Sequence, residues 1–437
     1  MTTSATQVTF DVVIVGAGPA GSAAAILLAR AGWSVALVEK QRFPRRKVCG
    51  ECIAASNLPW LEALGVGDAV SASAGPELRQ VLLLRGEHEV RAGLPAAAHA
   101  VHRWGRALGR ETLDTLLLEQ ARAAGATLFQ PWSVLAIRGQ AGAWRCDLRA
   151  VETTTHLTLN SPLVIDAHGS WEALPQGRIG PRPARAACDL FAFKANFTGA
   201  ALAAGELPVL ALDGGYGGMV LAGNGETTVA CCVRSDRLDS LRRAAPGVRA
   251  GDVVQAWLER ECRGVRDTLR GANRSGPWLA SGPIAPGIRV QADGGPFRIG
   301  NAAGEAHPIL GESMSMALQS AGLLCAELLA AAPPGGLGST AWQHTVGRAY
   351  ALHWRAQFTP RLRLAAAFAQ VAMRPRTAAL LMKMAGRWPG LLTRGAAWGG
   401  KVRCAVDPTM FDRPHAQPTV WNRDAGAAAV RVAGQAT

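Results

Sequence analysis

The 437-residue chain has very little lysine and no long uninterrupted apolar segment. Only five of its 46 basic residues are lysines, so arginine supplies most of the formal net charge of +14. The longest apolar run, 316–332, contains Gln319 and Glu327, and is therefore too polar for a membrane span of about 20 residues. Residues 1–10 show neither a basic nor a long apolar region, so we expect no secretory signal.

Acidic residues are missing from a long C-terminal stretch. Between Leu328 and Val406 there is no Asp or Glu, whereas Arg and Lys occur eleven times. Two interpretations remain open for the helices expected there. They either bind an anionic membrane surface peripherally, or cover the rest of the protein while their arginines extend into water. We expect no nucleic-acid partner, because the charge is scattered and no recognition motif accompanies it.

The composition favours a folded cytoplasmic protein. Hydrophobic residues make up 49% of the chain and charged residues 18%, which excludes a disordered chain and suits two or three packed units. The nine cysteines are odd in number and irregularly spaced, which favours reduced thiols over a disulfide framework. We expect no metal site.

The first 40 residues carry a dinucleotide-binding pattern. A β-branched strand, 11–15, runs into Gly16, Gly18 and Gly21, and a helix is expected from Ala20 to Ala31. These glycines permit a tight turn, close approach of a pyrophosphate and close packing of helix on strand. The second strand, 33–38, ends at Glu39, which is placed to bind an adenosine ribose.

Further elements follow along the chain. We expect a helix from Arg110 to Ala124, a strand over 127–137, shorter strands to 167, antiparallel strands over 190–197, 218–221 and 227–233, and a helix over 314–331. A linker is expected at 333–336. The remainder should be helical, with breaks at Pro360, Pro375 and Pro389.

Three separated motifs resemble those of the FAD-dependent oxidoreductases that include p-hydroxybenzoate-hydroxylase-type monooxygenases, flavin halogenases and geranylgeranyl reductases. They are the Gly16–Gly21 fingerprint with Glu39, the Asp166-Ala-His-Gly-Ser stretch, and Gly300-Asn-Ala-Ala-Gly followed by Pro308 and Gly311. The resemblance implies an α/β fold. A Rossmann-like FAD-binding domain would be built from discontinuous segments, with an inserted antiparallel β-sheet substrate domain and a C-terminal helical region.

The implied domain bounds follow from the order of these motifs. The FAD-binding domain would comprise 1–75, 101–180 and 285–335, and the substrate domain 76–100 and 181–284. Residues 336–437 would form the helical region and tail.

The resemblance also implies cofactor contacts. Arg110 would reach the phosphate or ribityl region, unless it is a solvated surface arginine. Val134 would lie on the adenine side, and Lys40 beside Glu39 is a further candidate. Asn301, where the family usually has Asp, would bind a ribityl hydroxyl. The remaining contacts, with the pyrimidine edge of the flavin, would come from amides at Gly311, Glu312, Ser313 and Met314.

The segment from Phe43 to Cys52 resembles stretches that line the flavin in reductases and halogenases, which implies that Cys49 and Gly50 lie there. Cys49 and Cys52 also form a C-x-x-C pair, but a glycine-containing loop is a poor setting for thiol–disulfide chemistry. His168 is expected to be a packed or capping residue.

The reaction stays open among three hypotheses. The first is hydroxylation of a small lipophilic aromatic substrate, phenolic or polyketide-derived, by a single-component monooxygenase that uses NAD(P)H. The second is reduction of isoprenoid double bonds, and the third a non-catalytic flavin-binding scaffold or sensor. Halogenation is disfavoured, because no lysine occurs between Lys47 and Lys194. His307, Tyr216 and Cys49 are the candidate catalytic side chains.

Overall fold

A computed structural model describes residues 7–170, 186–330, 333, 335–398 and 408. Its first sheet is parallel and has the strand order β20 (Phe297–Arg298), β12 (Leu163–Asp166), β2 (Val12–Val15), β3 (Val35–Val38) and β8 (Thr127–Phe129). Strands β2, β3 and β12 are buried along their whole length, as expected of the apolar sequences of β2 and β3 and of the first three residues of β12. Three widely separated parts of the chain therefore build one sheet.

Helices cover this parallel sheet. Helix α1 (Pro19–Arg30) packs against α4 (Arg110–Ala123) and α8 (Ser313–Leu329), and the short helices α2 (Leu58–Ala63) and α3 (Gly67–Ser73) extend the same layer. The three segments η1 (Ala55–Asn57), η2 (Gly300–Ala302) and η3 (Pro308–Leu310) are single 3₁₀ turns. The principal apolar core lies between this layer and the sheet.

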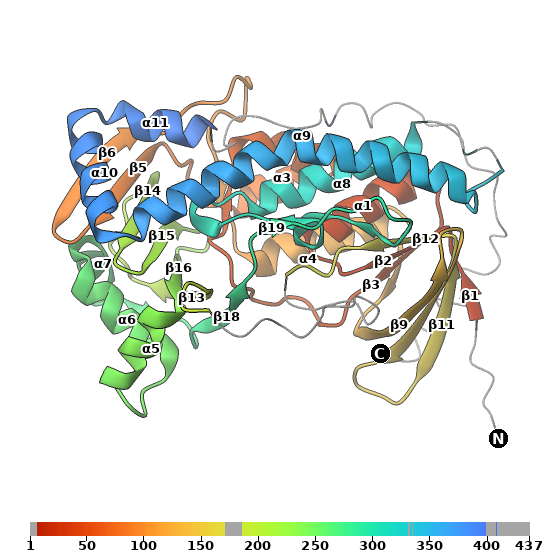
Figure 1. The fold of residues 1–437 in the computed structure, drawn as a ribbon, viewed down its shortest axis with the longest axis horizontal. Helices are drawn as coiled ribbons and strands as arrows, with labels where there is room; N and C mark the ends of the chain where they lie inside the picture. The colour runs from red at the N-terminus through yellow and green to blue at the C-terminus, as the bar shows by residue number, and fades with distance from the viewer. Residues whose placement is uncertain (1–6, 171–185, 331–332, 334, 399–407, 409–437) are drawn as a thin grey trace.

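A second sheet, of four strands, lies at one end of the molecule (Figure 1). Its order is β1 (Gln7–Thr9), β11 (His156–Ser161), β10 (Ala143–Ala150) and β9 (Trp132–Gln140). The single strand expected over 127–137 was therefore wrong. Pro131 separates β8, which pairs with β3, from β9, which pairs with β10, because proline has no backbone N–H to continue a ladder.

The largest sheet lies at the other end of the molecule (Figure 1). Its order is β17 (Asn273–Arg274), β13 (Leu190–Thr198), β16 (Thr227–Arg234), β15 (Gly215–Leu221), β14 (Glu206–Leu212), β5 (Gln80–Arg85) and β6 (His88–Gly93), and β18 (Leu279–Ile284) also pairs with β13. Helices α5 (Ser235–Ala244), α6 (Ala250–Glu261) and α7 (Arg263–Leu269) cover one face. We call this the substrate sheet.

Two small ladders join these parts. They are β4 (Cys52–Ile53) with β7 (Arg106–Ala107), and β19 (Gly287–Ile288) with β21 (Gly304–Glu305). The residue bounds expected for the domains stay a prediction, but the α/β architecture with an inserted, largely antiparallel sheet is confirmed.

The C-terminal helices cover the other face of the substrate sheet. Helix α9 (Thr340–Ala372) runs along the molecule, and α10 (Pro375–Arg387) and α11 (Gly390–Ala396) lie over β5 and β6 (Figure 1). Ala369 and Met373 pack with Tyr216, while Met382 and Ala385 pack with Leu83. These contacts show that the helices cover the sheet, and their binding to an anionic membrane stays a prediction.

Pro360 does not break a helix, contrary to the sequence-based expectation. It lies inside α9, on the exposed side, where the carbonyl that loses its hydrogen bond faces water. Trp354, Phe358 and Leu362 hold the opposite side of the helix in the core. Pro375 and Pro389 do separate helices as expected. Within the described residues, no helix combines the length and apolar character needed to cross a membrane.

Candidate functional site

In the glycine turn between β2 and α1, the backbone at Gly18 has free space beside it. Gly16 has a φ of 103°, and a Cβ at Gly21 would stand 1.8 Å from the Gly16 carbonyl oxygen, so both glycines are required by the turn itself. A Cβ at Gly18 would meet only the Nη2 atom of Arg110, at 3.9 Å. The fold therefore does not need glycine at 18, whereas a phosphate approaching the amides of α1 does.

Glu39 directly follows β3 beside this turn and is 7% exposed. Its Oε2 accepts a hydrogen bond from the Ala17 amide at 3.0 Å and its Oε1 accepts one from the Gln41 amide at 2.9 Å. Each carboxylate oxygen has further acceptor capacity, so a ribose hydroxyl can still be bound. Lys40, the next residue, is exposed.

A group of cations lies next to the turn. Arg110 is buried, which contradicts the alternative of a solvated surface arginine. It forms two hydrogen bonds of 2.7 Å with Asp114. Burial opposes its charge, but Asp114 outweighs burial and raises the pKa of Arg110. Burial, and then the charges of Arg110 and Arg45, lower the pKa of half-buried Lys47 to about 8. The surplus of positive charge beside the open turn fits a diphosphate.

The late loop brings a second set of predicted residues to the same region. Asn301 donates from Nδ2 to the Ser170 hydroxyl at 2.7 Å. Gly311 adopts a φ of 63°, after which Ser313 begins α8, with Glu312 buried at the helix cap. The start of α8 is thereby held beside the turn that carries Asn301.

A cavity of about 320 Å³ joins these regions to the substrate sheet. Eight predicted residues line it: Cys49, Gly50, Arg110, Tyr216, Asn301, Gly311, Ser313 and Met314. Its other end is apolar and is bounded by C-terminal side chains that include Leu364, Phe368, Leu381 and Leu392. Chain segments far apart in sequence thus form one continuous, mostly apolar space.

Other predicted residues lie away from the cavity lining. Val134 is half-buried on β9, against the core of the four-stranded sheet. His307 precedes η3, and burial lowers its pKa. His168 is bonded to Asp166 through its ring and its amide, as expected of a capping residue. Cys49 and Cys52, by contrast, both line the cavity, and neither is in a disulfide with a described residue.

Glu51 and Lys194 form a buried ion pair that the sequence analysis did not assign. Both side chains have 0% exposure. Glu51, at a φ of 58°, also accepts hydrogen bonds from the Arg110 amide at 3.0 Å and the Thr228 hydroxyl at 2.5 Å. The carboxylate therefore ties the cofactor-side loop and α4 to β13 and β16 of the substrate sheet. A lysine within the apolar strand 190–197 was the only available signal.

Glu305 is the second acid that the sequence analysis missed. It is 4% exposed on β21 and lines the cavity. Tyr216, 2% exposed, lines the cavity from β15. Burial, followed by the influence of Cys232 and Glu305, raises the pKa of Tyr216 well above its ordinary value. Glu305 and Tyr216 thus add two polar groups to the wall of a mostly apolar cavity.

Comparison with known proteins identifies the cofactor. A family model described as "FAD binding domain" matches residues 9–187. Over 328 residues the chain is 29% identical to the menaquinone reductase of Mycobacterium tuberculosis. This alignment covers 73% of this chain and 76% of that protein. These matches agree with the glycine turn, Glu39 and the cation group, which fit the diphosphate and ribose of FAD.

Solved structures show the same fold. The myxobacterial chondrochloren halogenase superposes with a TM-score of 0.70 at 17% identity, over 98% of this chain and 97% of that one. A geranylgeranyl bacteriochlorophyll reductase-like protein from Thermoplasma acidophilum gives a TM-score of 0.59 at 16% identity, over 97% and 96%. The shared fold by itself does not identify a reaction. The matched FAD-binding domain and the similarity to menaquinone reductase identify the chain as an enzyme, an FAD-dependent oxidoreductase, so the scaffold alternative is dropped.

Proposed function

We propose that this enzyme hydroxylates a lipophilic aromatic substrate in the cavity, with NAD(P)H as the reductant. The observation that carries the proposal is the cavity itself, which is apolar over most of its wall and presents Glu305 and Tyr216 as polar groups. A flat apolar molecule with one polar substituent suits such a space.

The cofactor would be held by residues already described. The amides that open α1 and the nearby Arg110 and Lys47 would bind its diphosphate, and Glu39 its ribose. The start of α8 would direct its amides and positive dipole end at the flavin ring. When bound, FAD supplies the hydride and oxygen chemistry of the reaction.

The protein's own contribution would be to position the substrate and exclude water. Gly217 and Gly218 of β15 contribute to the cavity wall beside Tyr216. Leu364 and Phe368 of α9 close the space from the other side. Removing water from such a site strengthens every polar interaction inside it.

The C-terminal wall offers a matched pair of variants. Leu381 lines the cavity, whereas its neighbour Leu380 is 58% exposed. If the substrate occupies this space, Leu381→Trp should raise KM by tenfold or more, and Leu380→Trp should leave KM unchanged. Equal effects of the two variants would place the substrate elsewhere.

The reaction itself is tested by product analysis. The purified holoenzyme is incubated with NADPH or NADH, oxygen, bromide and an alkylphenol, and the masses of the products are measured by mass spectrometry. We expect a gain of one oxygen. A gain of bromine would instead favour halogenation, against the sequence-based expectation. Lys194 is buried against Glu51 and absent from the cavity lining. The lysine that does line the cavity is Lys47, which we place at the diphosphate.

A second candidate is reduction of an isoprenoid double bond. The similarity to a protein named menaquinone reductase, over 73% of the chain, favours it. Anaerobic incubation with a polyprenyl substrate then gives a gain of two hydrogens and no gain of oxygen. The two outcomes exclude each other for a given substrate.

A further inference from the structure

Glu305 has one carboxylate oxygen that receives no hydrogen bond from a described residue. Its Oε1 accepts a hydrogen bond from the Ser170 hydroxyl at 2.8 Å. Its Oε2 is buried and accepts no hydrogen bond from any described residue, and the nearest cation to it, Nη2 of Arg289, stands at 3.6 Å. Buried carboxylate oxygens in folded proteins nearly always receive a hydrogen bond. The missing donor at the cavity wall points to a ligand.

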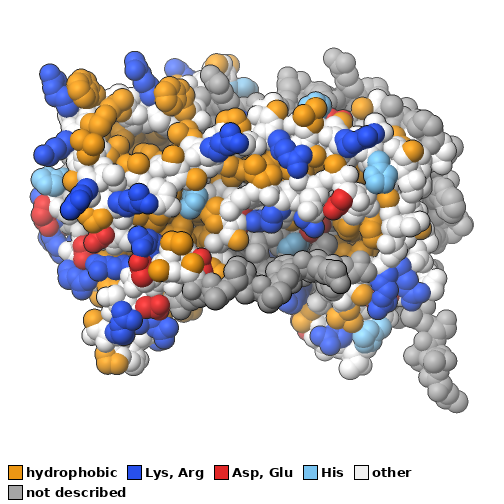
Figure 2. Space-filling model, viewed as in Figure 1, with side chains coloured by type: hydrophobic (Ala, Val, Ile, Leu, Met, Phe, Trp, Pro, Cys, Tyr) orange, Lys and Arg blue, Asp and Glu red, His pale blue; other side chains and the backbone are white. Residues whose placement is uncertain are grey.

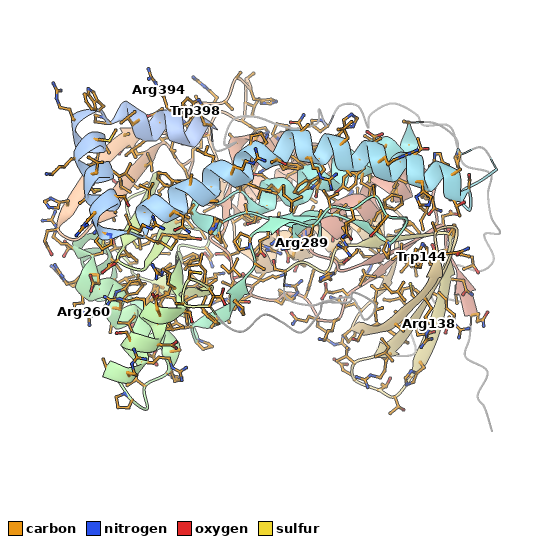
Figure 3. All side chains as sticks on the ribbon, viewed as in Figure 1. Arg138, Trp144, Arg260, Arg289, Arg394 and Trp398 are labelled. Carbon is orange, nitrogen blue, oxygen red and sulfur yellow. The ribbon has the colours of Figure 1, made fainter. Side chains whose placement is uncertain are left out.

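The orientation of Glu305 is set by a chain of hydrogen bonds. Asn301 donates to Ser170 at 2.7 Å, and Ser170 donates to Glu305. Arg289, near the centre of the view in Figure 3, donates to the Asn301 carbonyl oxygen at 2.6 Å. Each member fixes the next, so Oε1 is occupied by the protein and Oε2 is the oxygen left for binding.

Tyr216 presents a second polar group to the same cavity. Its hydroxyl is buried, and the group beside it is the Cys232 thiol, which is only a weak hydrogen-bonding partner. Because its pKa is raised, the phenol keeps its proton at neutral pH and acts as a donor. An acceptor oxygen without a hydrogen-bond donor and a phenol with only a weak partner therefore line the same, mostly apolar cavity.

We propose that Glu305 is the specificity-determining residue, which accepts at Oε2 a hydrogen bond from a phenolic hydroxyl of the substrate while Tyr216 donates to that same hydroxyl. The substrate class is then a phenol that carries an apolar chain, with the chain lying against Leu364, Phe368 and Leu381. This inference rests on the proposed function, since it names the substrate of the same cavity. A hydrogen bond to a carboxylate also raises the electron density of a phenol ring, which favours hydroxylation.

The test measures binding to the oxidised holoenzyme, so turnover is not needed. The probes are para-octylphenol, its methyl ether and octylbenzene, titrated by calorimetry. A hydrogen bond to a charged acceptor contributes at least about 1.4 kcal/mol, so the phenol should bind about tenfold more tightly than the ether. Glu305→Gln should remove that preference and leave octylbenzene binding unchanged. Tyr216→Phe should weaken the phenol and the ether, whose oxygens both accept a hydrogen bond, and leave octylbenzene binding unchanged.

Glu226→Gln is the matched control. Glu226 is a buried acid bonded to Arg46 and Asn224, and it does not line the cavity, so its variant should keep the phenol preference. Glu305→Asp should retain part of it. The proposal is overturned if the wild-type enzyme binds phenol and ether alike, if Glu305→Gln keeps the preference, or if Glu305→Gln loses its flavin, since the carboxylate would then serve the cofactor. Octylphenol that binds as expected without being hydroxylated would refute the proposed reaction and leave this recognition intact.

Discussion

The Glu51–Lys194 pair allows a quantitative prediction about how the cofactor side is joined to the substrate sheet. Both side chains are fully buried, and Lys194 has no other ion-pair partner among the described residues. Lys194→Met leaves a buried carboxylate supported only by the Arg110 amide and the Thr228 hydroxyl. Glu51→Gln leaves a buried ammonium without any counter-charge.

The expected cost of each single variant follows from this burial. Removing one partner of a buried ion pair destabilises a protein by about 3–5 kcal/mol. At about 2 °C per kcal/mol for a large domain, each single variant should lower the melting temperature by roughly 6–10 °C. The double variant removes both charges together, so its loss should be far smaller than the sum of the two single losses.

The assay is thermal unfolding of the holoenzyme, followed both by flavin release and by tryptophan fluorescence. Because Glu51 joins the cofactor-side loop to the substrate sheet, flavin release should move with the unfolding transition in both single variants. Additive losses in the double variant would refute the reasoning, because they would mean that the two charges do not compensate each other.

Three further predictions concern the cofactor turn, Lys47 and the C-terminal helices. Gly18→Ala should fold and lose FAD affinity at least tenfold, whereas Gly21→Ala should fail to fold, because its Cβ would stand 1.8 Å from a carbonyl oxygen. Circular dichroism measures folding, and dialysis of the holo-protein measures retention of FAD. A Gly18→Ala protein that stays yellow after dialysis would contradict the first prediction. The pKa of Lys47 falls from 10.5 to about 8 on folding, so the unfolded chain binds more protons than the folded one between these pH values. The stability of the FAD-free protein should therefore rise with pH across this range. FAD affinity should fall over the same range, because Lys47 loses its positive charge. Lys47→Met should flatten both pH profiles, and unchanged profiles would remove Lys47 from the diphosphate site. The cations and apolar side chains over α10 and α11 (Figure 2) should bind phosphatidylserine vesicles, so that the protein floats with the vesicles in a density gradient. The double variant Lys383→Glu with Arg387→Glu should abolish this binding, because each cation contributes about 1 kcal/mol. Flotation that is absent, or equal with neutral vesicles, would leave these helices only their covering role.

Local patterns were enough to predict the parts of the fold that depend on neighbouring residues. The strand, glycine turn and helix at the start of the chain are such a case, because the turn needs positive φ at Gly16 and a close approach at Gly21. The beginning of α4 at Arg110 and the helix breaks before Pro375 and Pro389 were predicted for the same reason. Pro360 shows the limit, since packing of Trp354, Phe358 and Leu362 keeps α9 continuous despite the proline.

Contacts between distant segments were decided only in three dimensions. No periodicity relates Glu51 to Lys194, or Ser170 to Glu305, since these pairs lie 143 and 135 residues apart. Their meeting depends on which sheet each strand joins and in what register, and that is set by the burial of apolar faces over the whole chain. The sequence was therefore sufficient to predict a dinucleotide site, whereas the cavity and the charged groups that face or support it arise from the tertiary packing of strands and helices from all parts of the chain.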